Sequence, residues 1–244
     1  MAQEKKRLDQ RVQELVPQYS RQQIQSWIMQ GKVTVDGLVA TKPGMQVTAD
    51  MVVHVNVEEP KYVSRAGFKL EKALDHFGLD VTGLVALDAG ISTGGFTDCL
   101  LQRGARKVYG IDVGYGQVHH KVSQDPRLIL KERTNLRLLE GVGELVDIVT
   151  LDLSFISVLK VMDVIDRILK KGGHLFILIK PQFEAEKHEV GKGGIIRDAQ
   201  IHAKVIERVT QGVVAHNYTC AGVTESPIQG GSGNTEFLAY FIKN

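Results

Sequence analysis

The sequence has few of the features that mark a secreted, membrane-bound or metal-dependent protein. Its two cysteines, Cys99 and Cys220, are too few for a disulfide framework and lack the spacing of a zinc site. No apolar run approaches the roughly 18 residues that a membrane helix needs, and the start, MAQEKKRLDQ, has no signal-peptide core. His119 and His120 have no partner at metal-ligand spacing. We therefore expect a cytoplasmic protein without a metal.

Net charge is also small, at +2, but it is unevenly distributed. Residues 1–57 contain seven Lys or Arg and five Asp or Glu, whereas residues 58–244 contain 23 of each. The positive excess therefore lies entirely in the first segment. An excess of this size is a weak indication of a polyanionic partner such as nucleic acid.

The N-terminal segment reads as a small α+β module. Apolar residues recur at helical spacing from Leu8 to Val16, and Ser20 is placed to cap a second helix that Gly31 ends. A DG turn at 36–37 and further extended segments predict a small antiparallel sheet. From spacing alone, a solvated face is the simplest interpretation of the basic residues on and around the two helices, which are Arg7, Arg11, Arg21 and Lys32.

Beyond residue 63, short apolar runs alternate with helical or loop segments, as in a parallel sheet with helices on both faces. The connection between the last two predicted strands is too short for a crossover, so these should be antiparallel. The pattern predicts a doubly wound, mostly parallel seven-stranded sheet with a reversed last strand, the class I (Rossmann-like) methyltransferase architecture. The predicted strands lie within 84–90, 107–114, 127–132, 145–154, 174–180, 220–226 and 236–243.

Ligands of such sheets bind beyond the carboxyl ends of the strands. DAGISTGG at 88–95 follows the first strand, and its glycines allow a sharp turn and a close ligand. Asp112 follows the second strand, where a carboxylate can accept both hydroxyls of a ribose. Glu132 follows the third, near an adenine or ribose or in a capping role. Both nicotinamide cofactors and S-adenosylmethionine (SAM) suit Asp112, but the glycine spacing disfavours dinucleotides, and there is no Walker lysine.

Charged side chains also stand at the ends of the later strands. Asp152 ends the fourth strand, Lys180 ends the fifth, and Glu236 begins the reversed last strand. All three should therefore meet at one edge of the sheet. Lys69 lies beside the apolar face of an amphipathic helix predicted within 62–78. A structural ion-pair network is the alternative interpretation of these charges.

The N-terminal segment resembles the ribosomal S-four-type RNA-binding domain. The matching residues are RLDQRV, SRQQIQSWIMQGKVTVDG and the KPG at 42–44. The resemblance implies that structured RNA binds the basic helix pair, and it favours an RNA-contact role for Arg7, Arg11, Arg21 and Lys32 over a solvated face.

The whole chain closely resembles the TlyA (hemolysin A) family, a branch of FtsJ-like RNA methyltransferases. The motifs are SRAGFKLEKAL, DAGISTGGFTDCLL, VDIVTLDLSFISV, LIKPQFEA, VGKGGIIRD and SPIQGGSGNTEFL. The resemblance implies an RNA-binding domain at 1–57, a linker at 58–62 and a methyltransferase domain at 63–244. It implies methyl transfer from SAM to a ribose 2′-hydroxyl of ribosomal RNA, within ribosomal subunits, by the tetrad Lys69, Asp152, Lys180 and Glu236. The positions implied for SAM are Asp88, Gly90, Ser92, Thr93, Gly94, Gly95, Phe96, Asp112, Glu132 and Asp152.

Further roles follow for individual residues. Arg65, Lys192 and Arg197 are candidates for RNA phosphates. Lys180 is the expected proton acceptor, although which lysine is neutral stays open. Ile91 stands where relatives more often carry alanine, so it could alter the cofactor turn.

Two other functions remain as alternatives: a class I methyltransferase with another acceptor, and a non-catalytic RNA-binding or assembly factor. DLSF after the fourth strand argues against amino-group methylation of bases, and neither cysteine resembles the thiol nucleophile of carbon-5 methylation. A membrane-active hemolysin is not expected. The modified nucleotide and the oligomeric state are beyond the reach of sequence.

Overall fold

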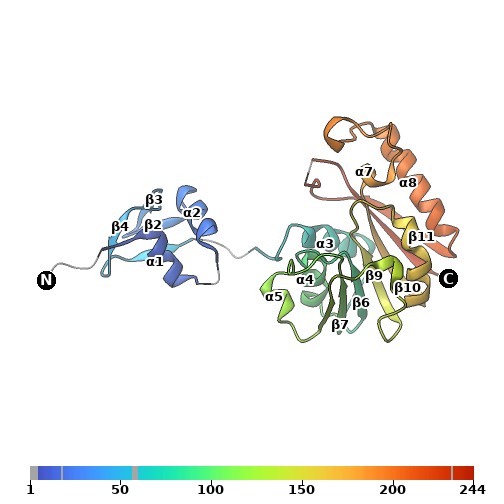
Figure 1. Ribbon diagram of the computed structural model, residues 1–244, viewed down its shortest axis with the longest axis horizontal. Helices are drawn as coiled ribbons and strands as arrows, with labels where there is room; N and C mark the ends of the chain where they lie inside the picture. The colour runs from blue at the N-terminus through green and yellow to red at the C-terminus, as the bar shows by residue number, and fades with distance from the viewer. Residues whose placement is uncertain (1–4, 18, 57–59, 232) are drawn as a thin grey trace. The chain divides into compact units, whose positions relative to one another are not determined.

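The computed structural model describes residues 5–17, 19–56, 60–231 and 233–244. The chain divides into two compact units, Met1–Pro60 and Lys61–Asn244, each of which is described by itself (Figure 1). Residues 58 and 59 of the predicted linker lie outside the described residues.

The first unit consists of two helices and two small antiparallel sheets. Strand β1 pairs with β4, and β2 lies between β3 and β5. Ser20 caps α2 as predicted: its hydroxyl accepts the N–H of Gln23, whose side chain accepts the N–H of Ser20. Leu15 is 45% exposed instead of joining the core, because α1 ends there. The elements are β1 (Lys5–Arg7), α1 (Leu8–Leu15), α2 (Arg21–Met29), β2 (Val33–Val35), β3 (Leu38–Ala40), β4 (Gln46–Thr48) and β5 (Val53–Val55).

The second unit is built on a seven-stranded sheet of order β11-β12-β10-β9-β6-β7-β8. Strand β12 runs antiparallel to β10 and β11, and the remaining neighbours are parallel, which confirms the predicted fold class. Strand β10 begins at Leu169, earlier than predicted. The strands are β6 (Val85–Ala89), β7 (Lys107–Ile111), β8 (Leu128–Lys131), β9 (Val146–Leu151), β10 (Leu169–Ile179), β11 (Tyr218–Glu225) and β12 (Phe237–Lys243).

Helices cover both faces of this sheet (Figure 1). On β10, Phe176 and Leu178 pack in the cluster that contains α3 and α4, whereas Leu175 and Ile177 pack in the cluster that contains α6 and α8. A strand buried on both faces needs an unbroken apolar run, which is what HLFILI supplies. The helices are α3 (Ala66–Phe77), α4 (Gly95–Gln102), α5 (His120–Ser123), α6 (Met162–Ile168), α7 (Pro181–Glu184) and α8 (Ala199–Val214), with 3-10 turns η1 (Leu136–Leu138), η2 (Val158–Val161) and η3 (Lys192–Gly194).

Helix α8, with 16 residues, is the longest helix among the described residues. None of the helices there combines the length and the apolar character that crossing a bilayer requires.

Candidate active site at the carboxyl ends of the strands

Two lysine–carboxylate pairs stand at the edge of the sheet where β9 and β10 end and β12 begins. Nζ of Lys180 lies 2.6 Å from Oδ1 of Asp152 and also donates to Oγ of Ser154 at 3.0 Å. Nζ of Lys69 donates to Oε2 of Glu236 at 2.5 Å. Because β9 and β10 are parallel neighbours, Asp152 and Lys180 leave the sheet side by side. The reversed direction of β12 brings Glu236 to the same edge.

The Lys69–Glu236 pair is deeply buried. Lys69 is only 8% exposed and Glu236 only 3%, although Lys69 was expected to border the apolar face of its helix. Two charges so far from water are tolerated when they compensate each other, and removing one would leave the other costly to bury. Helix α3 packs against β12 through Leu70 and Leu74, whose cluster includes Leu238. This packing carries Lys69 to Glu236.

A cavity of about 510 Å³ opens beside Asp152. This volume lies within the range of small-molecule and cofactor sites. Its lining includes four of the predicted cofactor positions, Gly90, Ser92, Asp112 and Asp152. Asp152 thus faces the cavity and also contacts Lys180, so one side chain joins the cavity to the ion pairs.

The turn after β6 is held by Asp112. Its Oδ2 accepts the N–H of Ser92 at 2.8 Å and its Oδ1 accepts the N–H of Gly114 at 2.7 Å. Ser92 and Gly90 both adopt positive φ, at 48° and 85°. A Cβ on Gly90 would lie 2.5 Å from the carbonyl oxygen of Asp152, so only glycine lets these two backbone segments meet. The turn and the carboxylate therefore form one preorganised wall of the cavity.

The other predicted cofactor positions stand outside this lining. Phe96 is buried in the cluster with α3 and α4, and Glu132 accepts the N–H of Gly116 at 2.7 Å, which is the capping alternative. A Cβ on Gly95 would lie 2.2 Å from Oγ of Ser64, so this glycine admits the segment before α3. Thr93 accepts a backbone N–H through its carbonyl, and Gly94 packs against Val122.

Asp88 is buried beneath the site. Its two carboxyl oxygens accept the hydroxyls of Thr97, at 2.7 Å, and Thr150, at 3.0 Å. Burial raises the pKa of Asp88 to about 6, and the nearby Asp152 adds to the rise, against the lowering effect of the two threonine hydroxyls. These contacts give Asp88 a role in holding β6, β9 and α4 together.

We expect Asp88→Asn to be more stable than the wild type above pH 6. Between about pH 4 and pH 6 the unfolded chain releases this proton while the folded chain keeps it, so this group makes the free energy of unfolding fall as pH rises. At about 1.4 kcal/mol per pKa unit, the cost above pH 6 is about 3 kcal/mol, and asparagine avoids it. Urea unfolding from pH 4 to pH 7 should show the two proteins diverging across this window; parallel curves would contradict a raised pKa.

Ile91 does not reach the cavity lining. It is 3% exposed and packs against β7, where a Cβ on Gly110 would come within 2.5 Å of its Cδ1. The glycine of the facing strand thus makes room for the larger side chain.

Sequence reasoning missed part of the cavity. A further part of the lining comes from the segment that follows β8, where Thr134, Asn135 and Arg137 line the cavity. Phe155, beyond β9, also lines it, with positive φ of 65°, 90% exposure and its ring centroid 5.0 Å from that of Phe183. A positive φ in a bulky residue that is 90% exposed marks Phe155 as a candidate for function, but both features are visible only in the structure.

In the N-terminal unit, the predicted basic residues are organised by a buried carboxylate. Asp9 is fully buried and accepts from Arg7 at 3.0 Å, from Arg21 at 3.2 Å and from Gln25 at 2.8 Å. The hydrogen bond from Arg7 is the main reason that the pKa of Asp9 lies well below its usual value. Two guanidinium groups share one carboxylate, so the cluster keeps a net positive charge.

The other predicted RNA contacts are dispersed. Arg11 forms an exposed pair with Glu14 at 3.1 Å, and Lys32 is exposed at the end of the α2 turn. In the second unit, Arg65 is exposed at the start of α3, and Lys192 and Arg197 are exposed on either side of a tight glycine turn. Asp198, next to Arg197, caps α8 by accepting the N–H of Gln200 at 2.8 Å.

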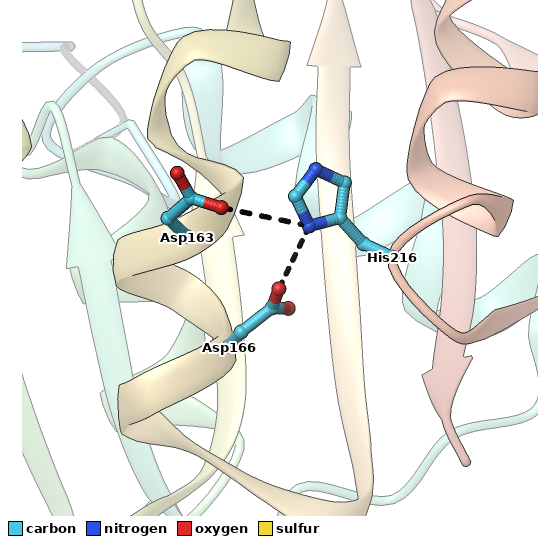
Figure 2. A group of neighbouring side chains, drawn as sticks. All are labelled: Asp163, Asp166 and His216. Carbon is cyan, nitrogen blue, oxygen red and sulfur yellow. Dashed lines mark hydrogen bonds and ion pairs between the residues drawn. The ribbon is translucent and has the colours of Figure 1, made fainter.

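A further group of titratable side chains lies at the opposite edge of the sheet, before β10 and β11 begin. Asp163 and Asp166 of α6 face His216, which follows α8 (Figure 2). Nδ1 of His216 lies 2.8 Å from Oδ2 of Asp166 and 3.9 Å from Oδ1 of Asp163, whose side chain is 88% exposed. We interpret the group as a side-chain contact that fastens α6 to the turn before β11.

Comparison with known proteins adds independent information. Residues 62–243 match the FtsJ-like methyltransferase family, and residues 6–53 match the S4 domain. The 16S/23S rRNA (cytidine-2'-O)-methyltransferase TlyA of Mycobacterium tuberculosis is 42% identical over 91% of this chain and 84% of its own length. Hemolysin A of Brachyspira hyodysenteriae is 41% identical over 91% of this chain and 94% of its own length.

Solved structures agree with the fold. A protein from Streptococcus thermophilus superposes with a TM-score of 0.75 at 40% identity, covering all of this chain and 90% of that one. The N-methyltransferase NodS of Bradyrhizobium japonicum, in complex with S-adenosylhomocysteine, has a TM-score of 0.51 at 19% identity, covering 72% of this chain and 87% of that one. At that identity the likeness extends to the fold alone.

Proposed function

Because this chain belongs to the FtsJ-like methyltransferase family, we propose that it transfers a methyl group from SAM to a ribose 2′-hydroxyl of ribosomal RNA. The observation that carries the proposal is the dual position of Asp152, which lines the cavity and pairs with Lys180. A methyl donor in the cavity and a hydroxyl at Lys180 would then meet at the same edge of the sheet. The name of the relative at 42% identity supports ribosomal RNA as the acceptor.

The residues of the cavity suit SAM. Asp112 presents carboxylate oxygens that still have lone pairs for two ribose hydroxyls, and Gly90 lets the backbone come close to the ligand. Asn135 and Arg137 supply further polar groups in the lining. When bound, SAM supplies a sulfonium methyl group that is already activated for attack.

Lys180 is our candidate for the proton acceptor. A ribose hydroxyl is a poor nucleophile until its proton leaves, so a base within hydrogen-bond reach is needed. The hydroxyl proton would pass to the lone pair of Nζ of Lys180 as the 2′-oxygen took the methyl group, and the bound SAM would give up that group and keep the carbon–sulfur electron pair. Asp152, at 2.6 Å, and Ser154, at 3.0 Å, hold that nitrogen at the mouth of the cavity. Alignment of the two substrates supplies the remainder of the acceleration.

Lys69 and Glu236 complete the proposed tetrad as the group that holds the ribose. Their mutual hydrogen bond and nearly complete burial fix both side chains before substrate arrives. A preorganised pair of this kind can orient a hydroxyl without reorganising during the reaction. Glu236 would accept from the ribose, and Lys69 would keep the carboxylate in place.

Phe155 is a candidate platform for a nucleotide base. An aromatic ring that is 90% exposed, beside the cavity and supported by Phe183, offers a flat surface on which a base can stack. Sequence-independent stacking of this kind contributes about 1–3 kcal/mol per base. Such a contact would bring the ribose of the stacked nucleotide toward Lys180.

Docking of the RNA is assigned to basic groups on each unit. On the S4 domain, Asp9 orients Arg7 and Arg21 so that their outer N–H groups are free for phosphates. Arg11 and Lys32 would add long-range attraction, and Arg65, Lys192 and Arg197 would contact phosphates on the methyltransferase unit. The substrate we propose is an assembled ribosomal subunit, which would place the reaction in the cytoplasm.

The test is methyl transfer from SAM with a tritiated methyl group to purified small and large ribosomal subunits. Alkali cannot cleave after a 2′-O-methyl ribose, so the proposed product leaves label in alkali-resistant dinucleotides. Label in mononucleotides would place the methyl group on a base. Binding of SAM without label on either subunit would contradict ribosomal RNA as the acceptor, and absence of SAM binding would favour a non-catalytic RNA-binding factor.

A further inference from the structure

Asn234, two residues before Glu236, has a buried side chain that connects its own loop to the loop of Gly194 and Ile196. It is 1% exposed, its Oδ1 accepts the N–H of Ile196 at 2.9 Å, and its Nδ2 donates to the carbonyl of Gly194 at 2.8 Å. Both ends of one amide are thus bonded to backbone groups of the segment that follows η3. A buried amide with both ends satisfied specifies one arrangement of the loops, because any other would leave polar groups unpaired.

The segment that Asn234 binds contains two glycines and the buried side chain of Ile196. Gly193 and Gly194 adopt positive φ, at 76° and 74°, and the segment lies between the two exposed basic residues Lys192 and Arg197. The carbonyl of Ile196 lies 3.2 Å from Nε2 of His202 on α8. Asn234 therefore adds two hydrogen bonds to a glycine turn that also has the bond from the N–H of Gly194 to the carbonyl of Gly191 at 3.0 Å.

On its other side, Asn234 leads directly to Glu236. The carbonyl of Asn234 accepts the N–H of Gly230 at 2.9 Å, and Gly230 lies so close to Glu236 that a Cβ there would come within 2.3 Å of Oε1. The carbonyl of Glu236 accepts the N–H of Ser226 at 2.8 Å. Gly230, in the loop that contains Asn234, thus packs directly on the Glu236 carboxylate.

We propose that Asn234 is a positioning residue, whose two side-chain hydrogen bonds hold the loop between Ser226 and Glu236 in the form that aligns the Glu236 carboxylate with Lys69 and the ribose. This inference rests on the proposed function, because Glu236 must act on the ribose for its alignment to matter. The same two bonds link Glu236 to the loop of Lys192 and Arg197. RNA phosphates bound there would hold the carboxylate more firmly in its working position.

The test compares kcat, the KM for ribosomal subunits and the Kd for SAM in Asn234→Ala and the wild type. We expect kcat to fall about 10- to 100-fold, the range that a small misalignment of reacting groups produces. The Kd for SAM should change less than about twofold, because the cofactor cavity is lined by other segments. If the wild type methylates RNA and Asn234→Ala has the same kcat, this inference is overturned and the proposed function stands.

The matched control is Tyr240→Phe, which removes a part-buried hydrogen bond to Nδ1 of His174 at 2.8 Å from the strand that follows Glu236. It should keep kcat near the wild-type value, so a fall in kcat from destabilisation alone would appear in both proteins. Gly230→Ala is a second route to the same defect, because its methyl group meets Glu236 while Asn234 stays intact. It should lower kcat as Asn234→Ala does, even where the latter folds poorly.

A double variant tests whether Asn234 acts through Glu236. In the Glu236→Gln background, Asn234→Ala should lower kcat less than about twofold further, since the carboxylate that it positions is already gone. If the fold-reductions in kcat of the two single variants multiply in the double variant, Asn234 acts independently of Glu236 and the inference is overturned. If the wild type itself transfers no methyl group to RNA, the result counts against the proposed function instead.

Discussion

Lys180→Ala is expected to lose methyl transfer to ribosomal RNA by about 10²- to 10⁴-fold, the range associated with a positioned base. The variant removes the proposed proton acceptor and the partner of Asp152 at 2.6 Å. SAM affinity should be largely kept, because Lys180 is absent from the lining of the cavity. Single-turnover transfer from tritiated SAM, with SAM binding measured by calorimetry, separates the two effects.

Two companion variants sharpen this result. Lys180→Arg keeps a positive charge beside Asp152 but provides a group that does not release its proton, so it should be nearly as inactive as alanine if Lys180 accepts the proton. Lys187→Ala removes an exposed lysine beyond α7 and should transfer methyl groups at the wild-type rate. Full activity in Lys180→Ala would move the chemistry to another acceptor or another base. Activity in the arginine variant alone would reduce Lys180 to an electrostatic role.

Much of the active edge was predictable because parallel strands end together. Asp152 and Lys180 close neighbouring strands, so chain direction alone places them side by side. Glu236 joined them because the short connection between the last two strands required an antiparallel pair. The resemblance to a methyltransferase family then supplied roles that strand order by itself could not.

Other features depended on packing that a sequence does not display. Lys69 pairs with Glu236 because α3 lies against β12, a contact between residues 167 positions apart. Asp88 stands in the cofactor motif, yet its carboxyl oxygens are taken by two threonine hydroxyls inside the sheet. The glycines of that motif also divide by environment, since Gly90 faces the cavity while Gly95 makes room for Ser64. Residue type indicated the region, but only tertiary contacts separated ligand contacts from structural support.

The N-terminal unit illustrates the same limit for charge. Helical spacing placed Arg7 and Arg21 on polar surfaces, but it could not reveal that the buried Asp9 accepts hydrogen bonds from both. A carboxylate buried between two arginines reduces their net charge and fixes their direction. The unit therefore presents an oriented pair of donors, which suits phosphate recognition better than a mobile basic face does.

Asp112→Ala is expected to weaken SAM binding by about 10- to 100-fold. The carboxylate accepts the N–H groups of Ser92 and Gly114 and is our candidate for the ribose hydroxyls of SAM, so the variant loses the ligand contact and loosens the turn. Hydrogen bonds to a charged group contribute about 1.5–3 kcal/mol each, and 1.4 kcal/mol corresponds to a tenfold change in Kd. Asp112→Asn keeps the size of the side chain but only one acceptor oxygen, so its Kd for SAM should lie between those of Asp112→Ala and the wild type. Calorimetric titration with SAM gives both values.

The Asp112 variants should bind SAM more weakly but keep the transfer rate, whereas the Lys180 variants should keep the SAM affinity and lose the transfer rate. At saturating SAM, Asp112→Asn should regain methyl transfer to within a few-fold of the wild type, because Asp112 binds the donor and takes no part in moving the proton. Asp80→Asn, which alters an exposed carboxylate that accepts the N–H of Thr82 on another turn, is the matched control and should leave the Kd unchanged. An unaltered Kd in Asp112→Ala would place the ribose elsewhere, against Asn135 and Arg137 of the same lining. A transfer rate that stays low at saturating SAM would instead mean that the turn held by Asp112 also positions Asp152, through the contact between Gly90 and the Asp152 carbonyl.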